Sequence, residues 1–239
     1  MRTMKPRLLL LEDEPTSRMF LATALAELPV EIDIAQTIAQ GRELAADGSH
    51  ALWLFDANLP DGTGGGLLAE LRSRGLSTPA LVHTAAVETG ERERLLAQGF
   101  TNVVVKPLSA GAWRQAVSAA LAQAPAPLPI GESAAGYGST ELPVWDDAAA
   151  IAALGGSRDN VDALRGLFLA ELPAARDAIM AAAQAGNHAA MHDTLHRLRA
   201  SCGFVGAARL DAAGQALRDA PHCPTRLQTF IEAAEVTAC

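Results

Sequence analysis

The stretch Ala51-Leu-Trp-Leu-Phe-Asp-Ala-Asn-Leu-Pro-Asp-Gly62 decides the fold of the first half of the chain. Its first five residues form a short apolar run bounded by turn residues, which favours a strand covered on both faces. Asp56 follows this strand directly, and Pro60 and Gly62 then make the chain turn. Ligands of open parallel α/β sheets bind beyond the carboxyl ends of the strands, so Asp56 is predicted to lie at a binding edge. An acid that only caps the next helix is the plainer interpretation of Asp56 alone.

Strand and helix patterns alternate on both sides of this stretch. Short apolar or alternating runs predict strands, and apolar residues at helical spacing predict helices between them. The expected strands are 7–11, 30–35, 51–55, 79–83 and 101–105, and the expected helices are 15–28, 38–46, 64–74, 88–98 and 109–123. Because crossovers between parallel strands are right-handed, this order predicts a doubly wound α/β sheet of the (βα)5 type.

Polar residues follow four of these strands. Glu12 and Asp13 come after the first strand and Asp56 after the third, while Thr84 and Lys106 end the fourth and fifth. Since the carboxyl ends of parallel strands meet at one edge of the sheet, these side chains are expected to form one site.

The carboxylates of this expected site repel one another unless a cation lies among them. Mg²⁺ fits, because it takes carboxylate and carbonyl oxygens and keeps several waters that a phosphate can replace. We expect Asp13 and Asp56 to be direct ligands of the ion and Glu12 to act through water. The backbone carbonyl of Asn58 would complete the ligands that the protein provides.

Four motifs in this order resemble the response-regulator receiver domain, over about residues 7–123. They are Leu-Leu-Leu-Leu-Glu-Asp-Glu-Pro (8–15), Leu-Phe-Asp-Ala-Asn-Leu-Pro-Asp-Gly (54–62), His-Thr-Ala (83–85) and Val-Lys-Pro (105–107). The resemblance implies a flavodoxin-like fold in which Asp56 accepts a phosphoryl group from a phosphohistidine. It also implies that Lys106 contacts the phosphoryl oxygens and that Thr84 hydrogen-bonds to them.

The composition changes after Gln123. A segment rich in Pro, Gly and Ala, without hydrophobic periodicity, is typical of a linker. Beyond it only helical patterns occur, which predicts an all-α bundle of short antiparallel helices. The expected helices are 146–154, 157–172, 173–185, 189–202, 207–219 and 224–236, with a new helix starting at Pro173 and a turn over 203–206. We therefore expect a domain over 1–123, a linker over 124–143 and a second domain over 144–239.

The chemistry of the second half lies in residues 192–206. His192, His196, Arg199 and Gly203 follow one stripe at helical spacing beside an apolar seam. A lone surface histidine is usually only solvated. Here Arg199, one turn beyond His196, can steady a phosphoryl group, and Gly203, two turns beyond it, leaves room for a docking partner.

This segment resembles the histidine phosphotransfer (HPt) domain, whose motif is His-x-Leu-Lys-Gly-Ser followed by a Gly. The chain reads His196-Arg-Leu-Arg-Ala-Ser-Cys-Gly203, with Arg199 for the Lys and Ala200 for the Gly. The resemblance implies that His196 carries phosphate. Two alternatives stay open: His192 as the acceptor, and a zinc ion bound by His188, His192 and His196, since histidines four residues apart can share a metal.

Composition excludes several classes of function. The formal net charge is -8, from 27 acids against 19 bases. Without a basic block there is no electrostatic footprint for direct nucleic-acid binding. No apolar stretch approaches the roughly 18 residues of a membrane helix, and no signal-peptide core follows the start, so we expect no membrane insertion and a cytoplasmic protein.

These observations predict a two-component phosphorelay protein. It would accept phosphate on Asp56 from a separate sensor histidine kinase, and His196 would exchange phosphate with a receiver-domain protein upstream or downstream. Such a chain is a phosphoryl-transfer intermediate that catalyses its own Asp phosphorylation and has no ATP-dependent kinase core. Two alternatives are a binding module controlled by phosphorylation of Asp56, and a phosphate sink that drains a kinase by hydrolysis.

Overall fold

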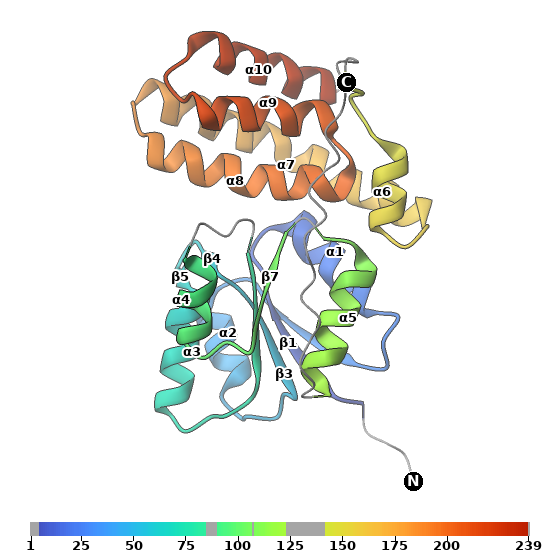
Figure 1. The fold of residues 1–239 in the computed structure, drawn as a ribbon, viewed down its shortest axis with the longest axis vertical. Coiled ribbons are helices and arrows are strands. Elements are labelled where there is room, and N and C mark those ends of the chain that lie inside the picture. The colour runs from blue at the N-terminus through green and yellow to red at the C-terminus, as the bar shows by residue number, and fades with distance from the viewer. Residues whose placement is uncertain (1–4, 85–89, 107, 123–141, 239) are drawn as a thin grey trace. The chain divides into compact units, whose positions relative to one another are not determined.

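The computed structural model of the chain describes residues 5–84, 90–106, 108–122 and 142–238, which form two compact units (Figure 1). The first is an α/β unit and the second is entirely helical in its described part. The α/β unit contains β1 (Arg7–Leu11), α1 (Pro15–Leu25), β2 (Glu31–Ala35), α2 (Ile38–Ala45), β3 (Leu52–Asp56), β4 (Asn58–Leu59), β5 (Gly62–Thr63), α3 (Gly64–Ser73), β6 (Ala80–Thr84), α4 (Glu91–Ala97), β7 (Asn102–Val105) and α5 (Ala110–Leu121). The helical unit contains α6 (Asp147–Ala153), α7 (Arg158–Gln184), α8 (His188–Val205), α9 (Ala208–Asp219) and α10 (Pro224–Ala238).

The α/β unit is built on a five-stranded sheet in the order β2-β1-β3-β6-β7. Every neighbouring pair is parallel. Helices α1 and α5 cover one face of this sheet, and α2, α3 and α4 cover the other (Figure 1). The doubly wound (βα)5 fold predicted from the alternating patterns is therefore confirmed.

The central strands are buried on both faces, as their continuous apolar sequences indicate. Successive side chains point to opposite faces, so each strand supplies two cores. Toward α2, α3 and α4 lie Leu9, Leu11, Trp53, Phe55 and Val82. On the opposite face, the indole nitrogen of Trp113 in α5 donates a hydrogen bond to the carbonyl of Leu21 in α1, 3.2 Å away. This packing fixes the strand ends that carry the site.

The turn after β3 depends on a close backbone approach at Gly64. A Cβ atom at this position would come within 2.2 Å of the backbone carbonyl oxygen of Asp56. The Gly64 amide also donates to the carbonyl of Ala57, 3.1 Å away. Glycine lowers helix propensity, but at the start of α3 it lets the helix lie directly against the end of β3 and so fixes Asp56.

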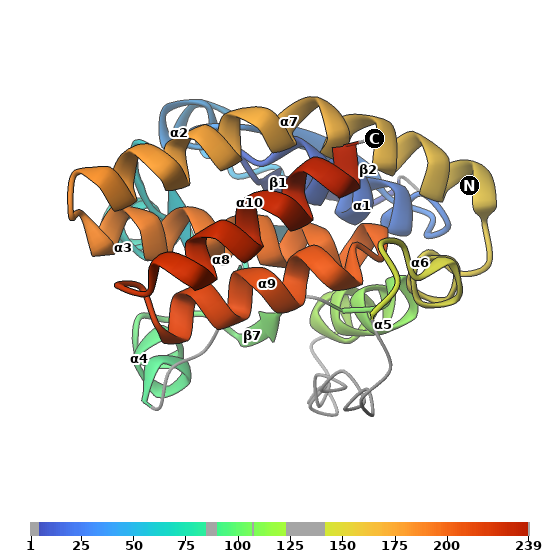
Figure 2. The same cartoon turned by 90° about the horizontal axis from the view of Figure 1, so that it is seen from above.

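The helical unit is a four-helix bundle with one added helix. Helix α7 packs on α8, α8 on α9, α9 on α10, and α10 returns to α7, while α6 packs on α7 and α8 (Figure 2). The all-α bundle predicted for this half of the chain is confirmed.

Two predicted helix boundaries are wrong. A single helix, α7, runs through Pro173, where we expected a new helix to start. An interior proline removes one backbone hydrogen bond, but Phe168, Leu172 and Ile179 form one buried stripe along the whole of α7. The burial of that stripe offsets the lost hydrogen bond, so the helix continues.

Helix α8 also continues beyond the predicted end at Cys202. Phe204 and Val205 are buried as part of the helix, and α8 ends at Gly206, whose φ of 75° is left-handed. A Cβ atom on Gly206 would lie 2.3 Å from the carbonyl oxygen of Asp146. Because glycine reaches this conformation at no steric cost, the helix ends there, and Gly203 is a helical residue.

The predicted linker, 124–143, lies outside the described residues except for its last two positions. Within the described ranges, no helix combines the length and the apolar character needed to cross a membrane.

Candidate functional site

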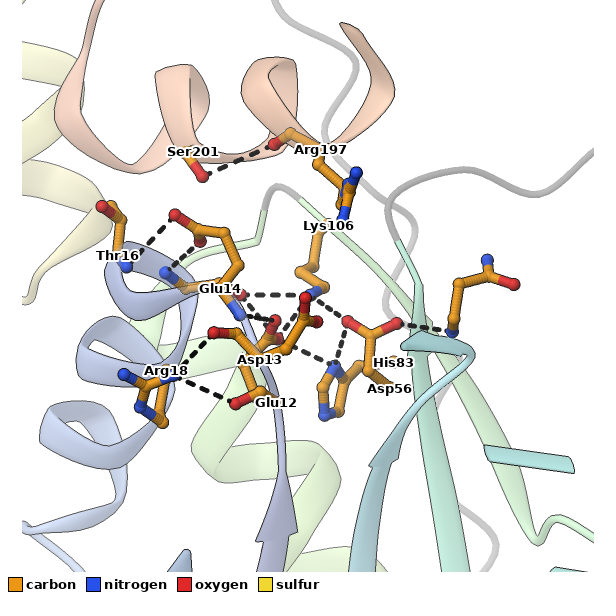
Figure 3. A network of polar contacts seen from close by, with 12 residues as sticks. Glu12, Asp13, Glu14, Thr16, Arg18, Asp56, His83, Lys106, Arg197 and Ser201 are labelled. Carbon is orange, nitrogen blue, oxygen red and sulfur yellow. Dashed lines mark hydrogen bonds and ion pairs between the residues drawn. The ribbon is translucent and has the colours of Figure 1, made fainter. Parts of the chain in front are cut away.

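The ammonium group of Lys106 lies at the centre of a buried polar network at the carboxyl edge of the sheet (Figure 3). Its Nζ donates to Oε2 of Glu12 at 2.6 Å and to Oδ2 of Asp56 at 2.7 Å. It also lies 3.0 Å from Oγ of Ser17, which donates to the same Glu12 oxygen at 2.7 Å. The structure thus brings together three residues predicted from the strand ends.

Each member of this network is held by a different element. Glu12 follows β1, and Asp56 is the last residue of β3. Lys106 follows β7, and its amide donates to the carbonyl of Thr84 at the end of β6, 2.7 Å away. The other oxygen of the Asp56 carboxylate, Oδ1, accepts a hydrogen bond from the Asn58 amide at 2.9 Å. Stiff strands and backbone hydrogen bonds therefore position the carboxylate.

Burial and charge give the two carboxyl groups opposite protonation behaviour. Burial raises the pKa of Glu12 to about 7, against the attraction of Lys106. Burial acts in the same direction on Asp56, but Lys106 and His83 outweigh it and hold the pKa of Asp56 below its usual range. Burial alone would lower the pKa of Lys106, but the Asp56 and Glu12 carboxylates outweigh this effect and raise that pKa above its usual value. Asp56 is therefore a carboxylate at neutral pH, as a nucleophile must be.

The remaining predicted residues of this edge lie around the network. Asp13 is half-buried beside it (Figure 3), and Arg18 donates to the Asp13 backbone carbonyl at 2.8 Å. Thr84 is buried at the end of β6, and Asn58 begins β4. A buried acidic pair, Glu12 and Asp56, is thus present at the edge where a cation was expected.

His83 is a site residue that the sequence reasoning missed. It precedes Thr84 in β6, its side chain is 0% exposed, and its Nδ1 lies 3.5 Å from Oε2 of Glu12 and 3.6 Å from Oδ2 of Asp56. Its ring also meets Trp113 edge-on, with 5.6 Å between ring centroids. A polar residue one position before the end of an apolar strand was the available signal.

In the helical unit, His196 lies half-buried in the middle of α8. Its ring is nearly parallel to that of His192, at 11°, with centroids 6.3 Å apart. Gly203 is seven residues further along the same helix, on the same side as His196. The continuous helix therefore preserves the predicted stripe.

Arg199 has a partner that the sequence did not indicate. Its Nε donates to Oδ1 of Asp211 in α9 at 2.7 Å. The aliphatic part of its side chain lies over Gly214, close enough that a Cβ there would come within 3.2 Å of Cγ of Arg199. Arg199 thus joins α8 to α9 through at least one of its nitrogens.

The zinc alternative in the helical unit does not match the structure. Among the described residues, Glu12, Asp56 and His83 are the one group of three side chains whose potential metal-binding atoms converge. The ring of His188 instead packs against that of His222 in the loop before α10, with centroids 4.1 Å apart. The histidines at 188, 192 and 196 therefore do not form a three-ligand site.

Comparisons with known proteins match both halves of the chain. Residues 8–118 match the response regulator receiver domain family, and residues 163–237 match the Hpt domain family. The chain is 30% identical over 117 residues to the response regulator protein PilR of Pseudomonas aeruginosa, a match that covers 49% of this chain and 26% of PilR. It is 35% identical over 101 residues to the two-component response regulator PhoP of Pseudomonas aeruginosa, covering 42% of this chain and 45% of PhoP.

Both matches leave most of the relatives' own length uncovered, because the chain spans less than half of either protein. Among solved structures, the receiver domain of a Francisella response regulator is 21% identical, with a TM-score of 0.47, covering 50% of this chain and 98% of that one. With its parallel sheet, its helical bundle and both family matches, the chain contains a response regulator receiver domain over residues 8–118, followed by an Hpt domain over residues 163–237, the domains of two-component phosphorelay signalling.

Proposed function

We propose that this protein is a phosphorelay intermediate that accepts a phosphoryl group on Asp56 and carries phosphate on His196. The observation that carries the proposal is the setting of the Asp56 carboxylate. It is kept ionised by Lys106 at 2.7 Å, and its second oxygen is oriented by the Asn58 amide. A sensor histidine kinase would supply the phosphoryl group, and a receiver-domain protein would exchange it with His196.

The acceptor step follows from this geometry. An oxygen of Asp56 forms a bond to phosphorus while the bond between phosphorus and the donor's imidazole nitrogen breaks. The imidazole nitrogen keeps the electron pair and later takes up a proton. Lys106 is already beside the acceptor oxygen and balances charge as the phosphoryl group arrives, and the hydroxyl of Thr84 at the same edge would hydrogen-bond to it.

The residues of this edge fit a Mg²⁺ ion. The carboxyl groups of Glu12 and Asp56 share a single ammonium group, that of Lys106, so a further positive charge can be accommodated beside them. Glu12, Asp13, Asp56 and the Asn58 carbonyl offer the oxygen donors that Mg²⁺ takes. When bound, the ion would neutralise charge on the transferring phosphoryl group.

His196 suits the carrier role because it lies on the side of a regular helix with Gly203 two turns away. A docking protein needs access to the imidazole, and a glycine two turns away on the same side of the helix has no side chain to obstruct that access. Arg199 would help to steady the phosphoryl group, although part of its guanidinium is committed to Asp211.

We also propose two domains, over residues 1–123 and 144–239, joined by a linker over 124–143. We further propose a cytoplasmic location, where ATP-dependent histidine kinases act. A tether of this kind raises the effective concentration of one site for the other. Transfer between Asp56 and His196 within one chain is therefore part of the proposal.

The test uses the whole chain with Mg²⁺ and acetyl phosphate, followed by intact-mass analysis of wild type, Asp56→Asn and His196→Gln. We expect phosphorylation of wild type and of His196→Gln, and none of Asp56→Asn. Acid-labile phosphohistidine in wild type that disappears in Asp56→Asn would show that His196 receives its phosphate from Asp56. Equal phosphorylation of Asp56→Asn and wild type would overturn the acceptor assignment.

A further inference from the structure

His83 is a buried imidazole to which the proposed phosphoryl transfer assigns no direct contact with the phosphoryl group. Its side chain is fully buried in β6. Neither ring nitrogen has a hydrogen-bond partner among the described residues. Buried polar groups are nearly always hydrogen-bonded, so an imidazole left in this state needs an explanation.

The ring is aimed at two carboxylates. Its Nδ1 lies 3.5 Å from Oε2 of Glu12 and 3.6 Å from Oδ2 of Asp56, too far for good hydrogen bonds. These separations match the spacing of ligand atoms around a tetrahedral metal ion. Donor atoms about 2.1 Å from a tetrahedrally bound ion lie about 3.4 Å from one another.

We propose that His83, Glu12 and Asp56 form a binding site for a transition-metal dication of the Zn²⁺ or Co²⁺ class, distinct in its donors from the all-oxygen Mg²⁺ site. The three potential ligand atoms lie within 4.8 Å of one another. An imidazole nitrogen favours such ions, whereas Mg²⁺ takes oxygen donors.

The ammonium group of Lys106 competes with this ion. It lies 2.6 Å from the Glu12 oxygen and 2.7 Å from the Asp56 oxygen that the ion would use. A dication balances the two carboxylates more fully than one ammonium does, so binding of the ion requires the buried Lys106 side chain to move away from them. The bound ion also occupies Oδ2 of Asp56, so, as far as the proposed acceptor role holds, it blocks phosphorylation.

A single histidine and a pair of histidines elsewhere in the chain provide controls. His50 is also buried in the α/β unit, but its Nε2 is 2.9 Å from Asp33, away from the site. His188 and His222 lie together in the helical unit and form a second candidate pair of histidines for such an ion.

The test is a titration of the metal-free whole chain with Co²⁺, following the visible absorption that a tetrahedral Co²⁺ site produces and measuring affinity by calorimetry. We expect one strong site in wild type, in His50→Gln and in His222→Asn. His83→Leu, which keeps an apolar side chain in the same space, should bind Co²⁺ at least about tenfold more weakly, with a smaller change in its affinity for Mg²⁺. Glu12→Gln should show the same loss, which keeps the test available should His83→Leu fail to fold.

Equal Co²⁺ affinity in wild type and His83→Leu would overturn the proposal, as would loss of the absorption in His222→Asn instead. Metal binding is measured here without phosphodonor, so its outcome is independent of the acceptor role of Asp56. A separate arm adds Zn²⁺ to the acetyl phosphate reaction, where excess Mg²⁺ should restore phosphorylation less readily in wild type than in His83→Leu.

Discussion

The two proposed phosphoryl sites are constructed in opposite ways. The Asp56 site is assembled from four strand ends, and Lys106 contacts Glu12 across 94 positions of sequence. The His196 site is carried by one helix, α8, with its relevant side chains within eight residues. The first site is buried and depends on a balance of charges, whereas the second lies along a helix surface.

This difference determines what a substitution does. In the buried network, removing one charge leaves its partners unpaired in a medium that solvates them poorly, so stability and chemistry change together. On α8, a half-exposed charge is solvated by water, so chemistry can change while stability does not. The predictions below use this contrast, from the largest expected effect to the smallest.

Replacing Lys106 by Met should have the largest effect. It leaves the Glu12 and Asp56 carboxylates together without their ammonium partner, and breaking a buried pair in this way costs about 3–5 kcal/mol. The unfolding free energy of the receiver domain, followed by tryptophan fluorescence in denaturant, should fall by this amount. Lys5→Met is the matched control, because Lys5 is exposed and is the only other lysine of the chain. An equal effect of both substitutions would contradict the described network.

Gly203 and Gly206, near the C-terminal end of α8, should respond differently to replacement by alanine. Gly206→Ala places a Cβ against the carbonyl of Asp146 in a left-handed conformation, which should destabilise the Hpt domain by about 2–3 kcal/mol. Gly203→Ala lies inside the helix, where alanine is favoured by up to about 1 kcal/mol. Thermal unfolding reports both values, and phosphotransfer to His196 should fall only for Gly203→Ala among folded variants. Destabilisation by Gly203→Ala as large as by Gly206→Ala would mean that Gly203 is a structural residue.

The pH dependence of stability should report Glu12. Its pKa is raised to about 7 in the folded chain, so the folded state binds an extra proton between about pH 4.5 and 7. The unfolding free energy should therefore fall as pH rises through this window, by on the order of 2 kcal/mol. Asp56 and Lys106 do not contribute in this window. The lowered pKa of Asp56 affects stability only at lower pH, and the raised pKa of Lys106 only at higher pH.

Glu12→Gln should abolish this slope and be more stable than wild type at pH 8. The measurement is denaturant unfolding at several pH values in a chelator, so that no divalent ion contributes. A slope between pH 4.5 and 7 that persists unchanged in Glu12→Gln would assign the effect to another group.

The smallest stability effect is expected for the ion pair of Arg199 and Asp211. Both side chains are partly exposed, at 23% and 37%, so breaking the pair should cost less than about 1 kcal/mol. Asp211→Asn should release Arg199 toward His196 and leave or increase the rate of phosphotransfer, whereas Arg199→Ala should lower it. If the two variants lower the rate equally, Arg199 acts by holding α8 to α9.

The fold was predictable to a large extent because its signals are periodic. Apolar strands and helical spacing indicated the doubly wound (βα)5 sheet and the helical bundle. The errors at Pro173 and Gly203 arose where local propensity and tertiary packing disagree: buried stripes along α7 and α8 carry each helix past a residue that usually ends one.

The polar residues were predictable where topology alone brings them together. Strand ends meet at one edge, which placed Glu12, Asp56 and Lys106 at one site. Contacts that depend on side-chain direction were not predictable. The sequence places His83 in a strand but does not show that its ring points toward Asp56. The hydrogen bond from Arg199 to Asp211 depends on how α8 packs on α9.

The central claim is that phosphate is held in two linkages, on Asp56 in the buried network and on the half-buried His196 of α8. ³¹P NMR of the whole chain during reaction with acetyl phosphate and Mg²⁺ tests it most directly. We predict an acyl phosphate signal followed by a phosphohistidine signal, with the second missing in His196→Gln and both missing in Asp56→Asn. A phosphohistidine signal that persists in His196→Gln, or an acyl phosphate signal that persists in Asp56→Asn, would contradict the account.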